Sequence, residues 1–171
     1  MAIKPKQYKK INNDKELEKS KKRLKTVFNL YRRLAGFERI GTSEAQKPII
    51  RGKCIACGKI LEVELYSDGS IMNGKDFAAS HLYDSDKYPN IEFLDDNVWL
   101  SCNRCNSPYG LHGNKVHYTI NLLKKIGQER FDKLTLAKNT IAKLNILDID
   151  RMIYEYKDKC KIEARRLKIK I

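Results

Sequence analysis

Two Cys-x-x-Cys pairs constrain this chain more than any other feature of its sequence: Cys54 with Cys57, and Cys102 with Cys105. Each pair allows a tight turn to present two thiolates to one ion, and four sulfurs complete the tetrahedron that Zn²⁺ accepts. Gly58 follows the first pair, where such a turn often needs a backbone angle that glycine adopts at low cost. A redox pair would place a single such motif at a helix start in a βαβ unit, whereas here two motifs lie in a strand-rich context. We therefore expect a structural zinc site, which is closed and performs no chemistry of its own.

The number of cysteines, together with the lack of a secretory or membrane-spanning segment, favours a reducing compartment. The N-terminal residues MAIKPKQYKK lack the apolar core of a secretory signal, and no segment approaches the ~20 apolar residues that span a bilayer. Five cysteines without such a signal favour the cytosol over a disulfide framework. Cys160 stands apart from the two pairs in a basic segment and is expected to be an incidental thiol. These features predict a cytoplasmic protein with no membrane partner.

The net charge of +14 is distributed unevenly along the chain. Residues 1–39 hold 13 Lys/Arg against 4 Asp/Glu, residues 40–150 hold 14 against 14, and residues 151–171 hold 8 against 3. Two basic segments around a neutral middle favour binding of a polyanion, because each Lys or Arg placed on a phosphate releases condensed counterions. A solvated surface is the alternative reading of the same charges. We expect DNA contacts from basic residues of both end segments: Lys21, Lys22, Arg23, Arg32, Arg33, Arg165 and Arg166.

Composition divides the chain into four segments. Residues 1–39 are predicted to be a basic arm and helix, with 1–12 unstructured, and residues 40–52 to be a linker. Residues 53–135 are predicted to be a zinc-clipped core, and residues 136–171 a basic helical region.

The N-terminal basic helix is expected to begin at a cap formed by Asn13 or Asp14, to continue to about Ala35 and to stop at Gly36. An apolar residue recurs at every seventh position of this helix: Leu17, Leu24 and Tyr31. This stripe predicts packing against the domain core, with a dimeric coiled coil, and hence a homodimer, as the alternative.

The core segment shows period-two patterns followed by helical ones. Residues 60–70 predict a hairpin arm with a turn at Asp68-Gly69, and FAASHLY and NVWLSC predict two further short strands. A helix that Gly127 ends is expected after Cys105, with one apolar face formed by Val116, Ile120, Leu123 and Ile126. Two further helices are expected, at about 128–144 and 148–168.

Three polar residues occur in a fixed order around the two cysteine pairs. His81 lies in a predicted strand between the pairs, Asn97 precedes the second pair, and Asn106 follows it directly, nine residues after Asn97. This order resembles the HNH (ββα-metal) nuclease motif, in which a β-hairpin and the following helix supply a histidine, an asparagine and a third His or Asn. Each residue alone also has a structural reading, as a packed histidine, a turn residue or a helix cap.

The chemistry of phosphodiester hydrolysis suits these residue types. A base must activate water, and a cation must stabilise the charge on the phosphate oxygens. His81 would be the general base and Asn106 a ligand of Mg²⁺ or Mn²⁺, since hard cations prefer oxygen ligands. The resemblance assigns Asn97 an architectural part, in bracing the loop that orients the base. Ser80 stands where many HNH enzymes carry an acidic metal ligand, so Asp76, Asp84, Asp86 or water would complete the set.

The resemblance to one family extends beyond the HNH motif. His81 is followed by Pro89-x-x-x-Phe93, by Asn97, by Cys102-x-x-Cys105-Asn106, by Gly113-Asn114-x-x-x-Tyr118 and by the Ile126-Gly-Gln-Glu129 stretch. This series is similar to that of the NinG/Rap family of lambdoid-phage recombination endonucleases and covers about residues 53–135. The resemblance implies a metal-dependent endonuclease that acts on branched DNA, such as D-loops and Holliday junctions. It also implies a bacterial host cytoplasm, association with the nucleoid, and phage or host recombination proteins as further partners.

The expected fold is therefore α+β: a small ββα-metal core with a Cys₄ zinc clip, flanked by basic α-helices at both ends. Two other functions use much of the same sequence. A non-catalytic zinc-ribbon protein that binds nucleic acid would need the cysteines and the charges, but neither His81 nor Asn106. A sequence-specific HNH enzyme of the restriction or homing kind would need a base-reading element, and none is recognisable.

Overall fold

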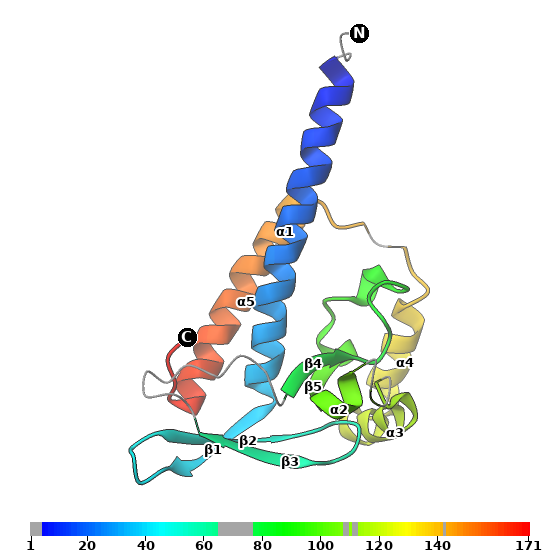
Figure 1. Cartoon of the computed structure of the whole chain (residues 1–171). Helices are drawn as coiled ribbons and strands as arrows, with labels where there is room; N and C mark the ends of the chain where they lie inside the picture. The colour runs from blue at the N-terminus through cyan, green and yellow to red at the C-terminus, as the bar shows by residue number, and fades with distance from the viewer. Residues whose placement is uncertain (1–4, 65–76, 108–109, 111–112, 142) are drawn as a thin grey trace.

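The computed structural model (Figure 1) describes residues 5–64, 77–107, 110, 113–141 and 143–171, and the side chains of 5–13 and of Leu61 lie outside the description. The helices are α1 (Pro5–Ala35), α2 (Asn103–Asn106), α3 (Lys115–Ile126), α4 (Gln128–Ala137) and α5 (Ile146–Leu167). The strands are β1 (Phe37–Thr42), β2 (Pro48–Lys53), β3 (Ile60–Glu64), β4 (Phe77–His81) and β5 (Val98–Cys102), and two short 3-10 helices, η1 (Pro89–Ile91) and η2 (Asp95–Asn97), precede β5. The expected α+β class is confirmed.

One sheet has the order β1-β2-β3, with both strand pairs antiparallel. The expected linker at 40–52 is therefore wrong, because these residues supply most of β1 and β2. The sequence of this segment hides its strands, since Gly41 sits at an irregularity in the β1–β2 register and Pro48 begins β2. The expected hairpin arm is present in part as β3, which pairs with β2, and its predicted turn at Asp68-Gly69 lies outside the described residues.

The second sheet is the antiparallel pair of β4 and β5, as FAASHLY and NVWLSC predicted. The register places His81 opposite Val98, next to the chain leaving η2, and Phe77 opposite Cys102. The two sheets meet at Gly52, where an added Cβ would lie 2.7 Å from a methyl carbon of Leu100. The sheets thus approach so closely that β2, which leads to the first cysteine pair, lies against β5, which leads to the second.

Helices α1 and α5 lie side by side and run in the same direction (Figure 1), although more than a hundred residues separate them. The thiol of Cys160 lies 3.6 Å from the carbonyl oxygen of Val27, and further along both helices Arg166 donates to the carbonyl of Leu34 at 3.1 Å. Leu24 and Phe28 are fully buried between α1 and α5. The apolar stripe of α1 therefore packs within the chain, which was the preferred reading of its heptad spacing.

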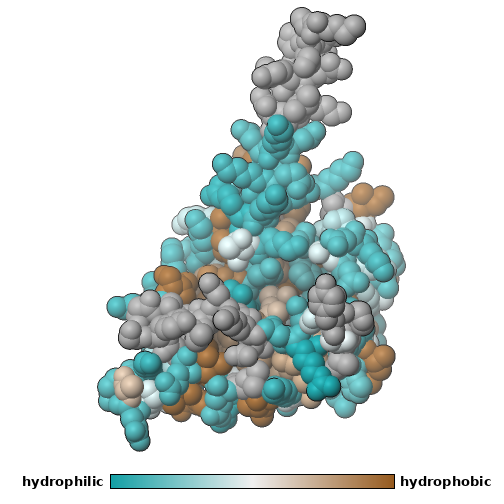
Figure 2. All heavy atoms as spheres, viewed as in Figure 1, coloured by the Kyte–Doolittle hydropathy of each residue, from teal (hydrophilic) through white to brown (hydrophobic). Residues whose placement is uncertain are grey.

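The N-terminal segment is more helical than expected. Residues 5–12 belong to α1, whose 31 residues make a rod of about 46 Å at 1.5 Å per residue. Its first turns extend beyond α5 in Figure 1, and hydrophilic side chains dominate the visible face of the helix next to the grey residues in Figure 2. Because the second half of α1 forms part of the core, residues 1–39 are not a detachable arm.

Helices α3 and α4 follow the second cysteine pair and contribute buried residues to the core cluster that contains three of the cysteines. Gly127 ends α3, as expected, but the predicted apolar face is wrong for most of its residues. Val116 and Ile120 are 70% and 47% exposed, whereas Ile126 is buried as predicted, together with Tyr118 and Leu122. Tyr118 decides the orientation of the helix, since its ring enters the core and its hydroxyl finds a partner there.

Candidate functional site

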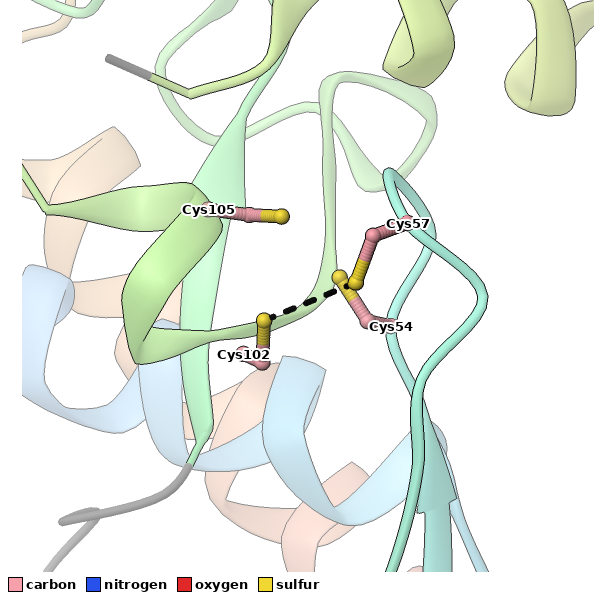
Figure 3. A group of neighbouring side chains, drawn as sticks. All are labelled: Cys54, Cys57, Cys102 and Cys105. Atoms are coloured by element: carbon pink, nitrogen blue, oxygen red, sulfur yellow. Dashed lines mark hydrogen bonds between the residues drawn. The ribbon is translucent and has the colours of Figure 1, made fainter. Parts of the chain in front are cut away.

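The sulfur atoms of Cys54, Cys57, Cys102 and Cys105 all lie within 4.8 Å of one another and point toward a common centre (Figure 3). The first two come from the turn between β2 and β3, and the other two from the end of β5 and from α2. The sulfurs of Cys57 and Cys102 are 3.7 Å apart. A tetrahedral ion with Zn–S bonds of about 2.3 Å requires sulfurs about 3.8 Å apart, so the cluster fits a metal ion such as zinc.

Backbone and side-chain hydrogen bonds hold the first cysteine turn. Gly58 adopts a φ of +74° and its amide donates to the carbonyl of Cys54 at 3.0 Å, which explains the glycine after this pair. The amide of Ile55 donates to the carbonyl of Leu100 at 2.9 Å and ties the turn to β5. The hydroxyl of buried Ser101 lies 3.4 Å from the sulfur of Cys54.

The thiols differ in acidity according to these contacts. Burial raises the pKa of Cys54, but the hydrogen bonds from Ser101 and from backbone amides outweigh burial and lower its pKa to about 6. Burial raises the pKa of Cys105 to about 12, because its effect is larger than that of the hydrogen bond with Asn114, which lowers this pKa. The first cysteine turn is thus already arranged to stabilise a thiolate, the form in which cysteine binds a metal.

The Gly113-Asn114 pair links the cluster to α3. The amide of Gly113, at a φ of +85°, donates to the carbonyl of Cys105 at 2.6 Å. Asn114 lies in the left-handed region, which asparagine tolerates, and its amide nitrogen is 3.7 Å from the sulfur of Cys105. Its side-chain oxygen lies 2.8 Å from Nδ1 of His117, which therefore carries a proton. The pair thus positions the start of α3 against the cluster.

His81 and Asn106 line one cavity of about 390 Å³, which we call the histidine pocket. The structure therefore brings together two residues that lie 25 positions apart in the sequence, at the ends of β4 and α2. The other lining residues are mostly oxygen-bearing: Ser80, Asp84, Ser85, Asp86, Gly113 and Lys115. Asp84 and Asp86 were two of the acidic residues considered as substitutes for the missing one at position 80, and Asp76 lies outside the described residues.

The imidazole of His81 is held in one tautomer. Its Nε2 lies 3.0 Å from the carbonyl oxygen of Glu92, and because a carbonyl only accepts, Nε2 carries the proton. Nδ1 of the neutral ring can accept a hydrogen bond, and none of the residues that the structure describes donates one to it. Burial lowers the pKa of His81, and the charges of Lys25 and Lys115 lower it further against the raising effect of Glu92. A neutral imidazole with one free nitrogen is the form that a general base requires.

Asn97 is fully buried and braces the loop between His81 and β5. Its side-chain oxygen accepts from the amide of Tyr83 at 2.9 Å, and its amide nitrogen donates to the carbonyls of Tyr83 at 3.1 Å and Ile91 at 3.0 Å. These bonds fix the segment that includes the Glu92 carbonyl, and through it the ring of His81. Asn97 does not line the histidine pocket, so its position suits the architectural part that the resemblance implies.

The sequence reasoning missed two residues of this region. Lys115 Nζ donates to the carbonyls of His81 and Leu82, both at 2.7 Å, and to Asp84 Oδ1 at 2.8 Å. The hydroxyl of Tyr118 donates to the carbonyl of Ser80 at 2.7 Å. Tyr118 belongs to the Gly-Asn-x-x-x-Tyr pattern and was recognisable by its spacing, whereas nothing distinguished Lys115 among the 35 Lys and Arg of the chain.

The residues expected to contact DNA fall into two groups. Lys22, Arg23 and Arg165 are exposed, and Lys21 is partly exposed. Arg166 is exposed as well, and only Arg32 and Arg33 face the fold. Arg32 is only 6% exposed, donates to the carbonyl of Val98 at 2.6 Å and lies 4.7 Å from the ring centroid of Trp99. Arg33 is half-buried. Arg166 donates to the carbonyls of Leu34 and Phe37 but keeps an exposed side chain. The placement therefore removes Arg32 and Arg33 from the expected DNA surface and leaves the other five residues on it.

None of the helices in the described part of the chain is both long and apolar enough to cross a membrane. A family model described as the bacteriophage lambda NinG protein matches residues 3–166. Comparison with curated proteins and with solved structures gave no significant match. The match extends the similarity of residues 53–135 to both basic helices, α1 and α5.

Proposed function

The chain belongs to the bacteriophage lambda NinG family, and from this premise we propose that it is a metal-dependent endonuclease that hydrolyses branched DNA during phage recombination. The proposal includes a structural zinc ion on the four cysteines, an HNH-type site at the histidine pocket, and a location in the bacterial host cytoplasm. Family membership by itself is consistent with a role in phage recombination. The chemistry has to be argued from the residues.

The observation that carries the proposal is the histidine pocket. One cavity contains a neutral histidine with a free Nδ1, an exposed asparagine amide and two carboxylates, Asp84 and Asp86. Oxygen donors of this kind suit Mg²⁺ or Mn²⁺, so Asn106 and the two carboxylates would hold the cation. Bound there, the cation would stabilise the negative charge that develops on the phosphate oxygens.

The residues of the chain would act as follows. Nδ1 of His81 removes the proton from the attacking water, and the Glu92 carbonyl stabilises the imidazolium that forms by accepting from Nε2. Asn97 keeps this carbonyl in place by fixing the preceding loop. Lys115 holds Asp84 and the end of β4 in position. The exposed basic residues of α1 and α5 provide sequence-independent phosphate contacts, which suit recognition of a DNA shape.

The proposal is tested by incubating the protein with a synthetic four-way junction and with a linear duplex of the same sequence. We expect Mg²⁺-dependent cleavage of the junction, with little cleavage of the duplex and none in EDTA. Binding of both DNAs without cleavage under any divalent cation would favour the non-catalytic zinc-ribbon function. Equal cleavage of both DNAs at one fixed sequence would instead favour an HNH enzyme of the restriction or homing kind.

The pH dependence of cleavage should reflect the environment of His81. A base works only when neutral, and burial lowers the pKa of this histidine below its usual value near 6.5. The protein should therefore keep its activity to a lower pH than a solvated histidine would allow, and the acid limb of the rate should have its midpoint below about 6.5. Single-turnover rates between pH 5 and 8 at saturating Mg²⁺ measure this midpoint, and a midpoint above 6.5 would contradict the assignment.

Asn106→Ala should impair cleavage in a way that the metal concentration partly restores. The variant removes one oxygen ligand, which water can replace at a cost in cation affinity. We expect a lower rate at 1 mM Mg²⁺ and partial recovery at higher Mg²⁺ or with Mn²⁺, measured as a shift of the metal titration. A rate that is low and independent of the metal concentration would show that Asn106 does not act through the cation.

A further inference from the structure

A second cavity, of about 750 Å³, lies beside the cysteine cluster and has no function in the mechanism above. We call it the knuckle groove, since Cys54 and Cys57 are among its lining residues. Asn114 and His117 line this groove, whereas Gly113 and Lys115 line the histidine pocket. The first turn of α3 therefore separates two neighbouring cavities.

The groove combines exposed basic side chains with a half-buried apolar surface. Lys53, Lys124, Lys125 and His117 are its exposed basic residues. Its accessible apolar surface comes from the half-buried residues Ala35, Ile55 and Trp99. None of the described lining residues is an aspartate or a glutamate, in contrast to the histidine pocket.

We propose that the knuckle groove binds an unpaired DNA strand next to the strand that enters the histidine pocket. This inference rests on the proposed function in taking DNA as the ligand. Proteins that bind single strands combine cations for the phosphates with apolar or aromatic surface for the bases and sugars. A duplex turns its bases inward and would use the lysines alone, so the apolar surface favours an unpaired strand. At a branch point an unpaired strand lies beside a paired one. The knuckle groove and the histidine pocket lie on either side of the first turn of α3, so each could hold one of these two strands.

The groove contains its own spectroscopic reporter. Trp99 lines it and is the single tryptophan of the chain. The ammonium of Lys125 lies 5.0 Å from the centroid of its ring. A strand that contacts the lysines of the groove would change the surroundings of this indole and so its emission. Tryptophan fluorescence therefore reports on this groove, and DNA bound elsewhere on the chain changes only the fluorescence anisotropy of a labelled DNA.

The test compares a labelled 20-nucleotide oligothymidine with a 20-base-pair duplex, both titrated with the full-length zinc-loaded protein without Mg²⁺. The variant Lys53→Gln/Lys124→Gln removes two charges from the groove. The control Lys133→Gln/Lys143→Gln removes two charges from exposed lysines on α4 and after it that line neither cavity. Zinc content and melting temperature are measured for each protein.

For the groove variant we expect an oligothymidine affinity lower by on the order of tenfold and a slope of log K against log salt smaller by about 1.4, since each lost single-strand contact accounts for about 0.7. The quenching of Trp99 by oligothymidine should be lost as well. Duplex affinity should change less than about twofold, and the control should behave like the wild type.

Three results would overturn the proposal. Unchanged oligothymidine affinity and quenching would show that no strand enters the groove. Equal losses on both DNAs would show a general effect of charge. Zinc loss with unchanged DNA binding would show that the lysines only balance the charge of the thiolates. Because the measurement involves no cleavage, a protein that binds oligothymidine in the groove but cuts no DNA would refute the nuclease and leave the groove standing.

Discussion

Replacing His81 with alanine is expected to lower the rate of junction cleavage by about 10²–10⁴-fold, the usual contribution of a general base. The reason is the single free nitrogen in the histidine pocket. Nε2 is committed to the Glu92 carbonyl, so Nδ1 is the atom available to take the proton of water. Among the described residues that line the pocket, no second histidine is present to replace it.

The second variant for this experiment is His81→Gln, whose amide can still donate to the Glu92 carbonyl but cannot accept a proton near neutral pH. Both variants should be inactive, and raising Mg²⁺ should restore neither, in contrast to Asn106→Ala. DNA affinity and zinc content should equal those of the wild type, which shows that the fold is intact. Cleavage by His81→Ala at the wild-type rate would refute the assignment and favour a non-catalytic zinc protein.

Replacing Cys54 with serine is expected to remove the metal and with it the folded core. A structural zinc site contributes about 10–16 kcal/mol of apparent binding free energy, which is as large as the whole stability of a typical domain, about 5–15 kcal/mol. The four sulfurs join the β2–β3 turn to β5 and α2, so their loss separates the two sheets. Elemental analysis should find less than one zinc per chain, and circular dichroism should show an unfolded or loosened protein.

Cys160→Ser is the matched control, because this thiol is also buried but lies between α1 and α5, outside the cluster. It should keep one zinc per chain and a cooperative melting transition. Wild-type protein treated with a chelator should behave like Cys54→Ser. If protein prepared without chelator contains no zinc, or if Cys54→Ser keeps both its metal and its melting temperature, the structural site is refuted.

The parts of the fold that the sequence predicted are those in which chemistry restricts the choice of residue. Four cysteines at this spacing have few other uses, and the strands around His81 and Val98 are short, mostly apolar runs next to polar residues. The failed predictions concern segments whose structure depends on pairing with other strands. Residues 40–50 contain a glycine and a proline and become strands because β1 pairs with β2 and β2 pairs with β3.

The same limit applies to the candidate site. The spacing of His81, Asn97 and Asn106 predicted which residues to examine, and the structure places His81 and Asn106 in one cavity and Asn97 behind it. Sequence spacing could not reveal that the Glu92 carbonyl binds His81, since every residue has a carbonyl. Nor could it reveal that the ammonium of Lys115 donates to three acceptors around the end of β4. On α3 the hydrophobic residues Val116 and Ile120 suggested the wrong face, because a tyrosine with a buried hydroxyl partner took the interior.

The parallel pairing of α1 and α5 has a consequence for synthesis on the ribosome. Leu24 and Phe28 emerge early, but the residues that cover them, Ile149 and Ile153, are translated more than a hundred positions later. At about 5–20 residues per second, the first helix waits several seconds for its partner. A chain interrupted after α4 would already carry the cysteines and the histidine pocket, yet its first helix would expose an uncovered apolar face. Such a fragment would be recognised by chaperones and proteases, so an incomplete product of translation would be removed.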